Sequence, residues 1–268
     1  MTKQINSREL ALKILYQINE EGAYANLALD KALFSCAGLD ARDKGFITEL
    51  VYGSVKYRGR LDYVLNQFAK TKVKKMDGWT RNILRMAAYQ ILQLDKVPHS
   101  AAVNEAVKLA QRKGFYNLKP FVNGVLRTIA REIGDLELPS REENEVRYLS
   151  VKYSMPEYLV EKWKAAYGVK TTEKILEDFL TERPITVRCR THKASLREIV
   201  TSLKSQGVTV EQAPYLPYAL KISDYNHILT LETFLQGKIL VQDVSSMLVA
   251  EAASPKKGDH IIDMCAAP

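Results

Sequence analysis

The chain has 268 residues, of which 46% are hydrophobic and 26% are charged, and it carries a formal net charge of +8. This length allows two domains, or two and part of a third, and the composition is typical of a globular protein rather than a disordered one. No apolar run approaches the ~20 residues of a membrane-spanning helix, and the first ten residues hold no hydrophobic signal core. The sequence therefore predicts neither a membrane protein nor a secreted one.

The positive charge is concentrated in the first half of the chain. Residues 1–140 contain 22 Lys and Arg against 14 Asp and Glu, whereas residues 141–268 contain 17 of each. Such a concentration attracts polyanions and makes their binding salt-dependent, although a solvated helical face is the alternative interpretation. The candidate RNA contacts in the most basic stretch are Lys56, Arg58, Arg60, Lys70, Lys72, Lys74 and Lys75.

The first 139 residues have the pattern of a compact all-helical domain. Asn6 followed by Glu9, and Asp40 ahead of another apolar series, are typical helix starts. Apolar residues then recur every three or four positions, with Pro98 between two of the predicted helices. Short loops between amphipathic helices predict a bundle with one core.

Three stretches of this half resemble the NusB family: ARDKGFITELVYG (41–53), RMAAYQILQLDKVPHSAAVNEAV (85–107) and LKPFVNGVLR (118–127). The resemblance implies a NusB-like RNA-binding domain over residues 1–139. Some polar residues of these stretches sit among predicted core positions, so we expect them to pack between helices rather than to contact RNA. They are Asn104, Glu105, Asn123 and Arg127.

The middle of the chain begins with polar helices and continues as a small α/β unit. Ser154, followed by Pro156 and Glu157, predicts a helix start with Ser154 as its cap. Alternating residues predict a strand at 185–190, with Ile185, Val187 and Cys189 on one face. The elements that follow complete a β-α-β-β-α-β order. They are a helix ended by Gly207, strands at 208–212 and 217–222, a helix near 230–235 and a strand at 238–242.

This unit resembles the RRM-like module that precedes the catalytic domain in RNA cytosine-C5 methyltransferases, which implies a second domain over residues 140–236. Arg188 and Arg190 are candidate RNA contacts on the polar strand face, with plain solvation as the alternative. That family often has Asn where Arg190 stands. Because the strand lacks the aromatic pair of a true RRM, we do not expect sequence-specific base stacking.

The last stretch predicts the start of a parallel α/β sheet. After the strand at 238–242, Asp243 caps a helix, residues 255–258 form a turn, and His260 to Met264 form a short buried strand. A loop of small residues then begins at the carboxyl end of that strand. In open α/β sheets this is where a nucleotide-like ligand binds.

The segments VQD (241–243) and IIDMCAAP (261–268) resemble the opening of the catalytic domain of the RNA cytosine-C5 methyltransferases. In that family the last motif continues with two glycines and a lysine, so we expect the chain to end inside it. The resemblance implies a Rossmann-like domain that starts at residue 237 and binds S-adenosylmethionine; an ordinary βαβ unit is the alternative. The residues assigned to the cofactor are Cys265, Ala266, Ala267 and Pro268. The expected fold class is α plus α/β, in three parts: 1–139, 140–236 and 237–268.

Three cysteines, Cys36, Cys189 and Cys265, are far apart and odd in number. This favours a reduced cytoplasm over a disulfide framework, and we expect no metal site, because the histidines and cysteines are not in ligand spacing. Cys36 and Cys189 fall among apolar positions and are predicted core residues. We assign no catalytic residue, since the resemblance implies that both catalytic cysteines belong to motifs outside these 268 residues. The chain alone is therefore expected to be inactive.

The resemblance implies that the complete protein uses S-adenosylmethionine to methylate carbon 5 of a cytosine in 16S rRNA, through a covalent cysteine intermediate. The expected partner is 16S rRNA, bound by a cytoplasmic monomer without a membrane or metal. Two alternatives are a non-enzymatic NusB-like RNA-binding or antitermination module and a tRNA cytosine-C5 methyltransferase. The first alternative gives no reason for the unit at 183–242.

Overall fold

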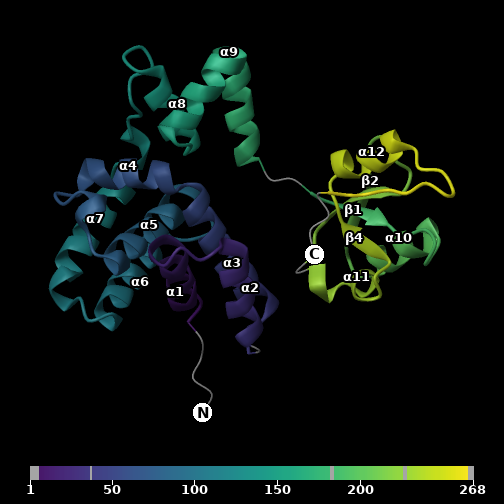
Figure 1. The fold of residues 1–268 in the computed structure, drawn as a ribbon. Helices are drawn as coiled ribbons and strands as arrows, with labels where there is room; N and C mark the ends of the chain where they lie inside the picture. The colour runs from purple at the N-terminus through teal and green to yellow at the C-terminus, as the bar shows by residue number, and fades with distance from the viewer. Residues whose placement is uncertain (1–5, 37, 182–183, 226–227, 265–268) are drawn as a thin grey trace. The chain divides into compact units, whose positions relative to one another are not determined.

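A computed structural model describes residues 6–36, 38–181, 184–225 and 228–264 (Figure 1). The chain forms two compact units that divide after Thr181, and each is described by itself. The first unit is entirely helical. Its α-helices are α1 (Ser7–Glu20), α2 (Ala25–Ser35), α3 (Ala41–Lys56), α4 (Arg58–Phe68), α5 (Gly78–Gln93), α6 (His99–Arg112), α7 (Lys119–Arg131), α8 (Glu145–Tyr153) and α9 (Glu157–Leu180), and its short 3-10 helices are η1 (Val73–Lys75), η2 (Tyr116–Leu118) and η3 (Ile133–Asp135).

The core of the helical unit is built around α5, which lies among α1, α3, α4, α6 and α7 (Figure 1). Ile83, Leu84 and Ala88 of α5 are fully buried. A helix that is covered on nearly all sides also buries polar residues, and each of these needs a hydrogen-bonding partner. Gln90 accordingly donates to the carbonyl oxygen of Met86 and accepts from Arg8. The predicted all-helical domain is confirmed.

Two arginines of α5 form ion pairs inside this unit. Arg85 donates two hydrogen bonds to the Asp62 carboxylate, at 2.6 and 2.7 Å. Arg81 binds the Glu20 carboxylate in the same two-point manner, and Asn82 donates a further hydrogen bond to it. These contacts neutralise two cations of the most basic stretch, so neither guanidinium is free to bind a polyanion.

The Glu20 cluster predicts how the stability of the unit depends on pH. Hydrogen bonds from Arg81 hold the pKa of Glu20 below its ordinary value of 4.5. A depressed carboxylate pKa stabilises the folded state above pH ~4.5, and this contribution is lost as the pH falls through the folded-state pKa. We expect Glu20→Gln to lower the free energy of unfolding at pH 7 by about 1–3 kcal/mol. Urea unfolding at pH 7 and pH 4 should show that the free energy of unfolding falls less between these pH values in the variant than in the wild type. Equal decreases in the two proteins would contradict this account.

Ser154 has a different role from the predicted one. It ends α8 in the left-handed conformation with φ 56°. Its Oγ accepts hydrogen bonds from the backbone N–H groups of Gly59, at 2.9 Å, and Arg60, at 3.3 Å. Ser154 therefore satisfies the first turn of α4, while α9 starts at Glu157 without a side-chain cap. The prediction that Ser154 caps the following helix was wrong, because its hydroxyl is engaged by a helix distant in sequence.

The second unit contains a four-stranded antiparallel sheet with the strand order β2-β3-β1-β4. The order of elements along the chain confirms the predicted β-α-β-β-α-β arrangement. The elements are β1 (Ile185–Cys189), α10 (Leu196–Ser205), β2 (Thr209–Gln212), β3 (Ala219–Ser223), η4 (Ile228–Thr230), α11 (Glu232–Leu235), β4 (Ile239–Val241) and α12 (Val244–Ala253).

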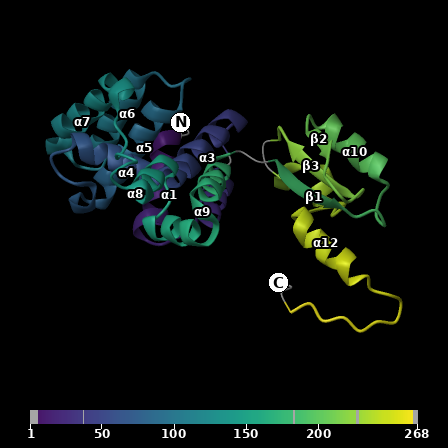
Figure 2. The same ribbon diagram turned by 90° about the horizontal axis from the view of Figure 1, so that it is seen from above.

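The two faces of this sheet pack against different helices. Val187 of β1 and Ile222 of β3 are buried in one cluster with Ile199 of α10. Ala219 points to the opposite face, because side chains alternate along a strand, and it packs against Met247 of α12. The α12 helix thus covers part of the face that carries Arg188 (Figure 2). As predicted, Asp243 caps α12.

The expected parallel strand at residues 260–264 does not form in the described structure. These residues have no strand conformation, and Ile261 and Ile262 are 65% and 86% exposed. A parallel strand needs a neighbour for its backbone hydrogen bonds, whereas the expected neighbour, β4, pairs antiparallel with β1. The compact units also differ from the three predicted domains. The segment 140–181 belongs to the helical unit, and β4 and α12 belong to the sheet unit.

Candidate nucleic-acid interface

Residues 70–75, here called the lysine loop, connect α4 to α5 and carry four exposed lysines: Lys70, Lys72, Lys74 and Lys75. Between them, Val73 is 1% exposed, and Met76, which follows the loop, is 8% exposed. The Asn66 side chain accepts from the Val73 N–H at 2.8 Å, and the Asn66 carbonyl oxygen accepts from Lys72 Nζ at 2.9 Å. The buried residues therefore fix the backbone, while the four lysines stay exposed and Lys72 makes one internal hydrogen bond.

The three predicted contacts near the α3–α4 junction differ in accessibility. Lys56 Nζ donates to the carbonyl oxygen of Leu180 at 2.7 Å, so part of its hydrogen-bonding capacity is used within the unit. Arg60 is half-buried, whereas Arg58 is exposed and donates one hydrogen bond, at 3.2 Å, to Asn19. Arg58 is therefore the most accessible of the three.

Arg188 and Arg190 belong to the sheet unit. Arg188 is exposed, and its guanidinium carbon lies 5.7 Å from the centroid of the Tyr218 ring. The Tyr218 hydroxyl donates to Glu251 of α12 at 2.5 Å. Arg190 is half-buried and donates to the carbonyl oxygen of Gly237 at 3.4 Å. Arg188 is thus the freer of the two, but it lies beside a helix that covers part of its sheet face.

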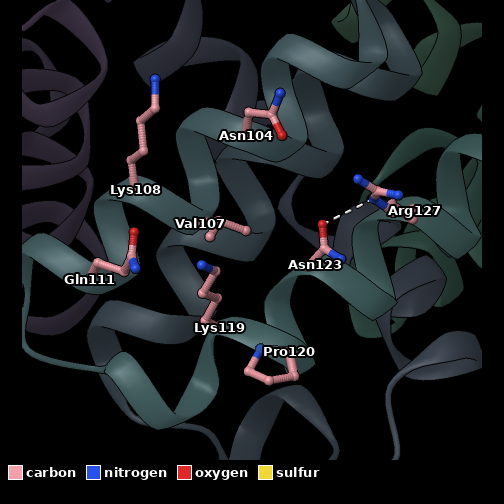
Figure 3. A pocket seen from close by; sticks show the side chains of 8 residues that line it. All are labelled: Asn104, Val107, Lys108, Gln111, Lys119, Pro120, Asn123 and Arg127. Atoms are coloured by element: carbon pink, nitrogen blue, oxygen red, sulfur yellow. Dashed lines mark hydrogen bonds between the residues drawn. The ribbon is translucent and has the colours of Figure 1, made fainter.

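A pocket of about 540 Å³ lies between α6 and α7 (Figure 3). Three of its lining residues are cationic (Lys108, Lys119 and Arg127), and none is acidic. Arg127 Nε donates to the side-chain Oδ1 of Asn123 at 3.0 Å, and Lys108 forms an ion pair with Glu105, which is outside the lining. The lining residues are Asn104, Val107, Lys108, Gln111, Lys119, Pro120, Asn123 and Arg127.

This pocket corrects the prediction that Asn104, Asn123 and Arg127 pack between helices. Asn104 and Arg127 are exposed, and Asn123 is half-buried at the pocket wall. Glu105 is also partly exposed, with 22% of its side chain accessible. The helices pack through their small and aliphatic residues instead, which leaves the polar residues at the edge of the contact. The sequence feature that could have indicated this surface is the series of polar residues at positions 104, 108 and 111, which lie on one face of α6.

The structure describes two of the three cysteines, Cys36 and Cys189. Cys189 is buried in the sheet core, where desolvation raises the pKa of its thiol to about 11. Cys189 is therefore a core residue as predicted, whereas Cys36 follows the end of α2 and is half-buried at the edge of the helical core. The predicted cofactor residues Cys265, Ala266, Ala267 and Pro268 lie outside the described residues. Within the described ranges, no three potential ligands cluster around a metal position, and no helix has the length and apolarity to cross a membrane.

Comparison with known proteins finds family matches for two stretches of the chain. Residues 5–131 match the NusB family, and residues 155–228 match the RsmF/B-like methyltransferase ferredoxin-like domain. The "Probable ribosomal RNA small subunit methyltransferase B" of Bacillus subtilis is 37% identical over 99% of this chain and 58% of the relative. The chain thus combines a NusB-family stretch with an RsmF/B-like ferredoxin-like stretch, and it is similar over nearly its whole length to a protein named methyltransferase B. The family resemblance inferred from the sequence is confirmed.

Other comparisons show the same similarity over nearly the whole chain. A protein of the same printed name from Synechocystis is 34% identical over 98% of this chain and 59% of the relative. The crystal structure of PH0851 superposes with a TM-score of 0.69 at 23% identity, over 96% of this chain and 58% of that one, and shares the fold. The chain thus spans less than two thirds of the length of these methyltransferase B relatives.

Proposed function

We propose that the complete protein transfers a methyl group from S-adenosylmethionine to carbon 5 of a cytosine in 16S rRNA. The observation that supports this is the combination of a NusB-family domain and a methyltransferase-type ferredoxin-like domain in one chain. That chain is 37% identical to a protein named a ribosomal RNA small subunit methyltransferase. Carbon 5 is a poor nucleophile, so the proposed chemistry begins with a cysteine thiolate adding to carbon 6 of the base.

In this proposal, residues 1–268 bind RNA and do not transfer methyl groups by themselves. The lysine loop, together with Lys56, Arg58 and Arg60, supplies cations to the phosphates of 16S rRNA, and Arg188 and Arg190 do so from the sheet unit. A thiol with a pKa of about 11, as at Cys189, is a poor source of thiolate at neutral pH. The protein is further proposed to act as a cytoplasmic monomer.

S-adenosylmethionine supplies an electrophilic methyl group when it is bound, and the cofactor loop is proposed to comprise Cys265, Ala266, Ala267 and Pro268. Small side chains allow backbone N–H groups to approach a ligand closely. The described residues just before this loop, 260–264, are exposed and form no strand. The proposed role of the loop is therefore supported by the sequence resemblance alone.

The test is methyl transfer from labelled S-adenosylmethionine by the complete protein, with 16S rRNA and a tRNA pool as separate substrates. We expect 5-methylcytidine in digests of 16S rRNA only. Label in tRNA alone, or on another atom of the base, would contradict the proposal. Residues 1–268, assayed in parallel, should bind 16S rRNA fragments without transferring label, and label from this polypeptide would refute its inactivity.

A further inference from the structure

We propose that the α6–α7 pocket is a second RNA-binding site of the helical unit, which holds phosphates of a single-stranded segment through Lys119 and Arg127. The inference rests on the proposed function, because that function makes RNA the ligand. The pocket lining includes no residue of the lysine loop and none of the basic residues that the sequence predicted to contact RNA. It is therefore a separate surface with its own test.

The charges of the pocket favour an anionic ligand. Among the described residues, no carboxylate forms an ion pair with Lys119 or Arg127, whereas Lys108 is paired with Glu105 at 2.7 Å. The backbone at the start of α7 adds little to this attraction, because the Lys119 N–H donates to the Tyr116 carbonyl oxygen and Pro120 has no N–H. The anionic preference therefore comes from the two cationic side chains.

The remaining lining residues suit a nucleotide better than a bare anion. Asn104, Gln111 and Asn123 each carry a side-chain amide that can both donate and accept hydrogen bonds. Val107 and Pro120 provide apolar surface between the polar groups (Figure 3). Amide groups can bond to the exposed edges of an unpaired base while the cations hold its phosphates. A pocket of about 540 Å³ is large enough to take such a group.

RNA is also favoured over an acidic protein segment by the charge of the surrounding unit. The whole net charge of the chain, +8, arises within residues 1–140. A unit with this excess attracts a long polyanion over its whole surface and so raises the local concentration of RNA at the pocket. Phosphates, unlike carboxylates, recur at every nucleotide, so one strand can bind several cationic surfaces together.

The test compares two double variants of the 268-residue chain, Lys119→Gln/Arg127→Gln and Lys31→Gln/Arg42→Gln. Both remove one exposed lysine and one exposed arginine. The control pair lies on α2 and the first turns of α3, and α2 is on the side of the helical unit opposite to α7 (Figure 1). Fluorescence anisotropy with a labelled single-stranded fragment of 16S rRNA, between about 0.03 and about 0.3 M salt (about threefold either side of 0.1 M), measures affinity and its salt dependence.

We expect the pocket variant to lose affinity about tenfold to thirtyfold at ~0.1 M salt, and the slope of log K against log salt to fall by about 1.4, at about 0.7 per lost phosphate contact. In the control variant, the loss of affinity and the change in salt slope should each be less than half of those in the pocket variant. Equal affinity and slope in wild type and pocket variant would overturn the inference, and would leave RNA binding by the lysine loop and methyl transfer intact. Absence of RNA binding by the wild-type chain would also overturn the inference. The methyl-transfer assay on the complete protein tests the proposed enzymatic activity separately.

Discussion

Replacing Gly53 by alanine is expected to lower the free energy of unfolding of the helical unit by about 2–3 kcal/mol. A Cβ atom on Gly53 of α3 would lie 2.0 Å from Cζ and 2.2 Å from Oη of Tyr89, far inside van der Waals contact. Tyr89 is 4% exposed, its hydroxyl donates to Glu49, and its ring lies 5.9 Å from that of Tyr57. The ring therefore cannot move aside without losing buried contacts and a hydrogen bond.

The same helix offers a matched control in Gly45, where a Cβ atom would meet nothing within 4 Å. Gly45→Ala is expected to stabilise the unit by about 0.5–1 kcal/mol, because alanine loses less backbone entropy in a helix than glycine does. Urea unfolding followed by far-UV circular dichroism gives both values. If both variants raise the midpoint, helix propensity alone determines the effect and the packing argument fails.

The features that could be predicted from the sequence are those set by neighbouring residues. Asn6 and Asp40 cap their helices as expected, because a cap depends only on the next three residues. The two strand faces were correct at Val187 and Cys189, since alternation is a property of the backbone. The NusB-like stretches added the arrangement of the helices, which periodicity by itself does not give.

The features that failed depend on partners distant in the sequence. The hydroxyl of Ser154 is used by α4, 94 and 95 positions away, and local propensity contains no sign of this contact. The apolar run at Ile261 and Ile262 has the composition of a buried strand, yet a strand forms only where another strand pairs with it. Whether such apolar residues are buried therefore depends on a neighbouring strand as well as on their own sequence.

The candidate interface shows the same division between local and distant information. The exposure of the lysine loop follows from its composition, with lysines around one buried valine. In contrast, the loss of Arg81 as a free cation depends on Glu20, 61 positions away, and the engagement of Lys56 depends on Leu180, 124 positions away. The α6–α7 pocket depends on how two helices meet, so its lining could not be separated from the core by pattern alone.

The lysine loop gives the largest expected effect on RNA binding. Lys70→Gln/Lys74→Gln/Lys75→Gln removes three exposed lysines that form no ion pair among the described residues. At about 0.7 per phosphate contact, the salt slope should fall by about 2 and affinity at ~0.1 M salt by about a hundredfold. Val73 and Met76 are unchanged, so the loop backbone and the melting temperature should stay as in the wild type.

A matched control for this variant is Lys162→Gln/Lys170→Gln/Lys174→Gln on α9, which also removes three exposed lysines from the helical unit. The α9 lysines are interspersed with Glu161, Glu173 and Glu177, so they do not form a surface of one sign. The control should therefore lose less than about a fifth of the expected slope change. An equal loss in both variants would show that RNA responds to total charge rather than to the lysine loop.

The lysine loop and the α6–α7 pocket can also be tested for binding of one RNA strand together. In that case, a variant with both sets of substitutions should lose less affinity than the product of the two separate losses. The reason is that removing either surface already ends the bivalent attachment.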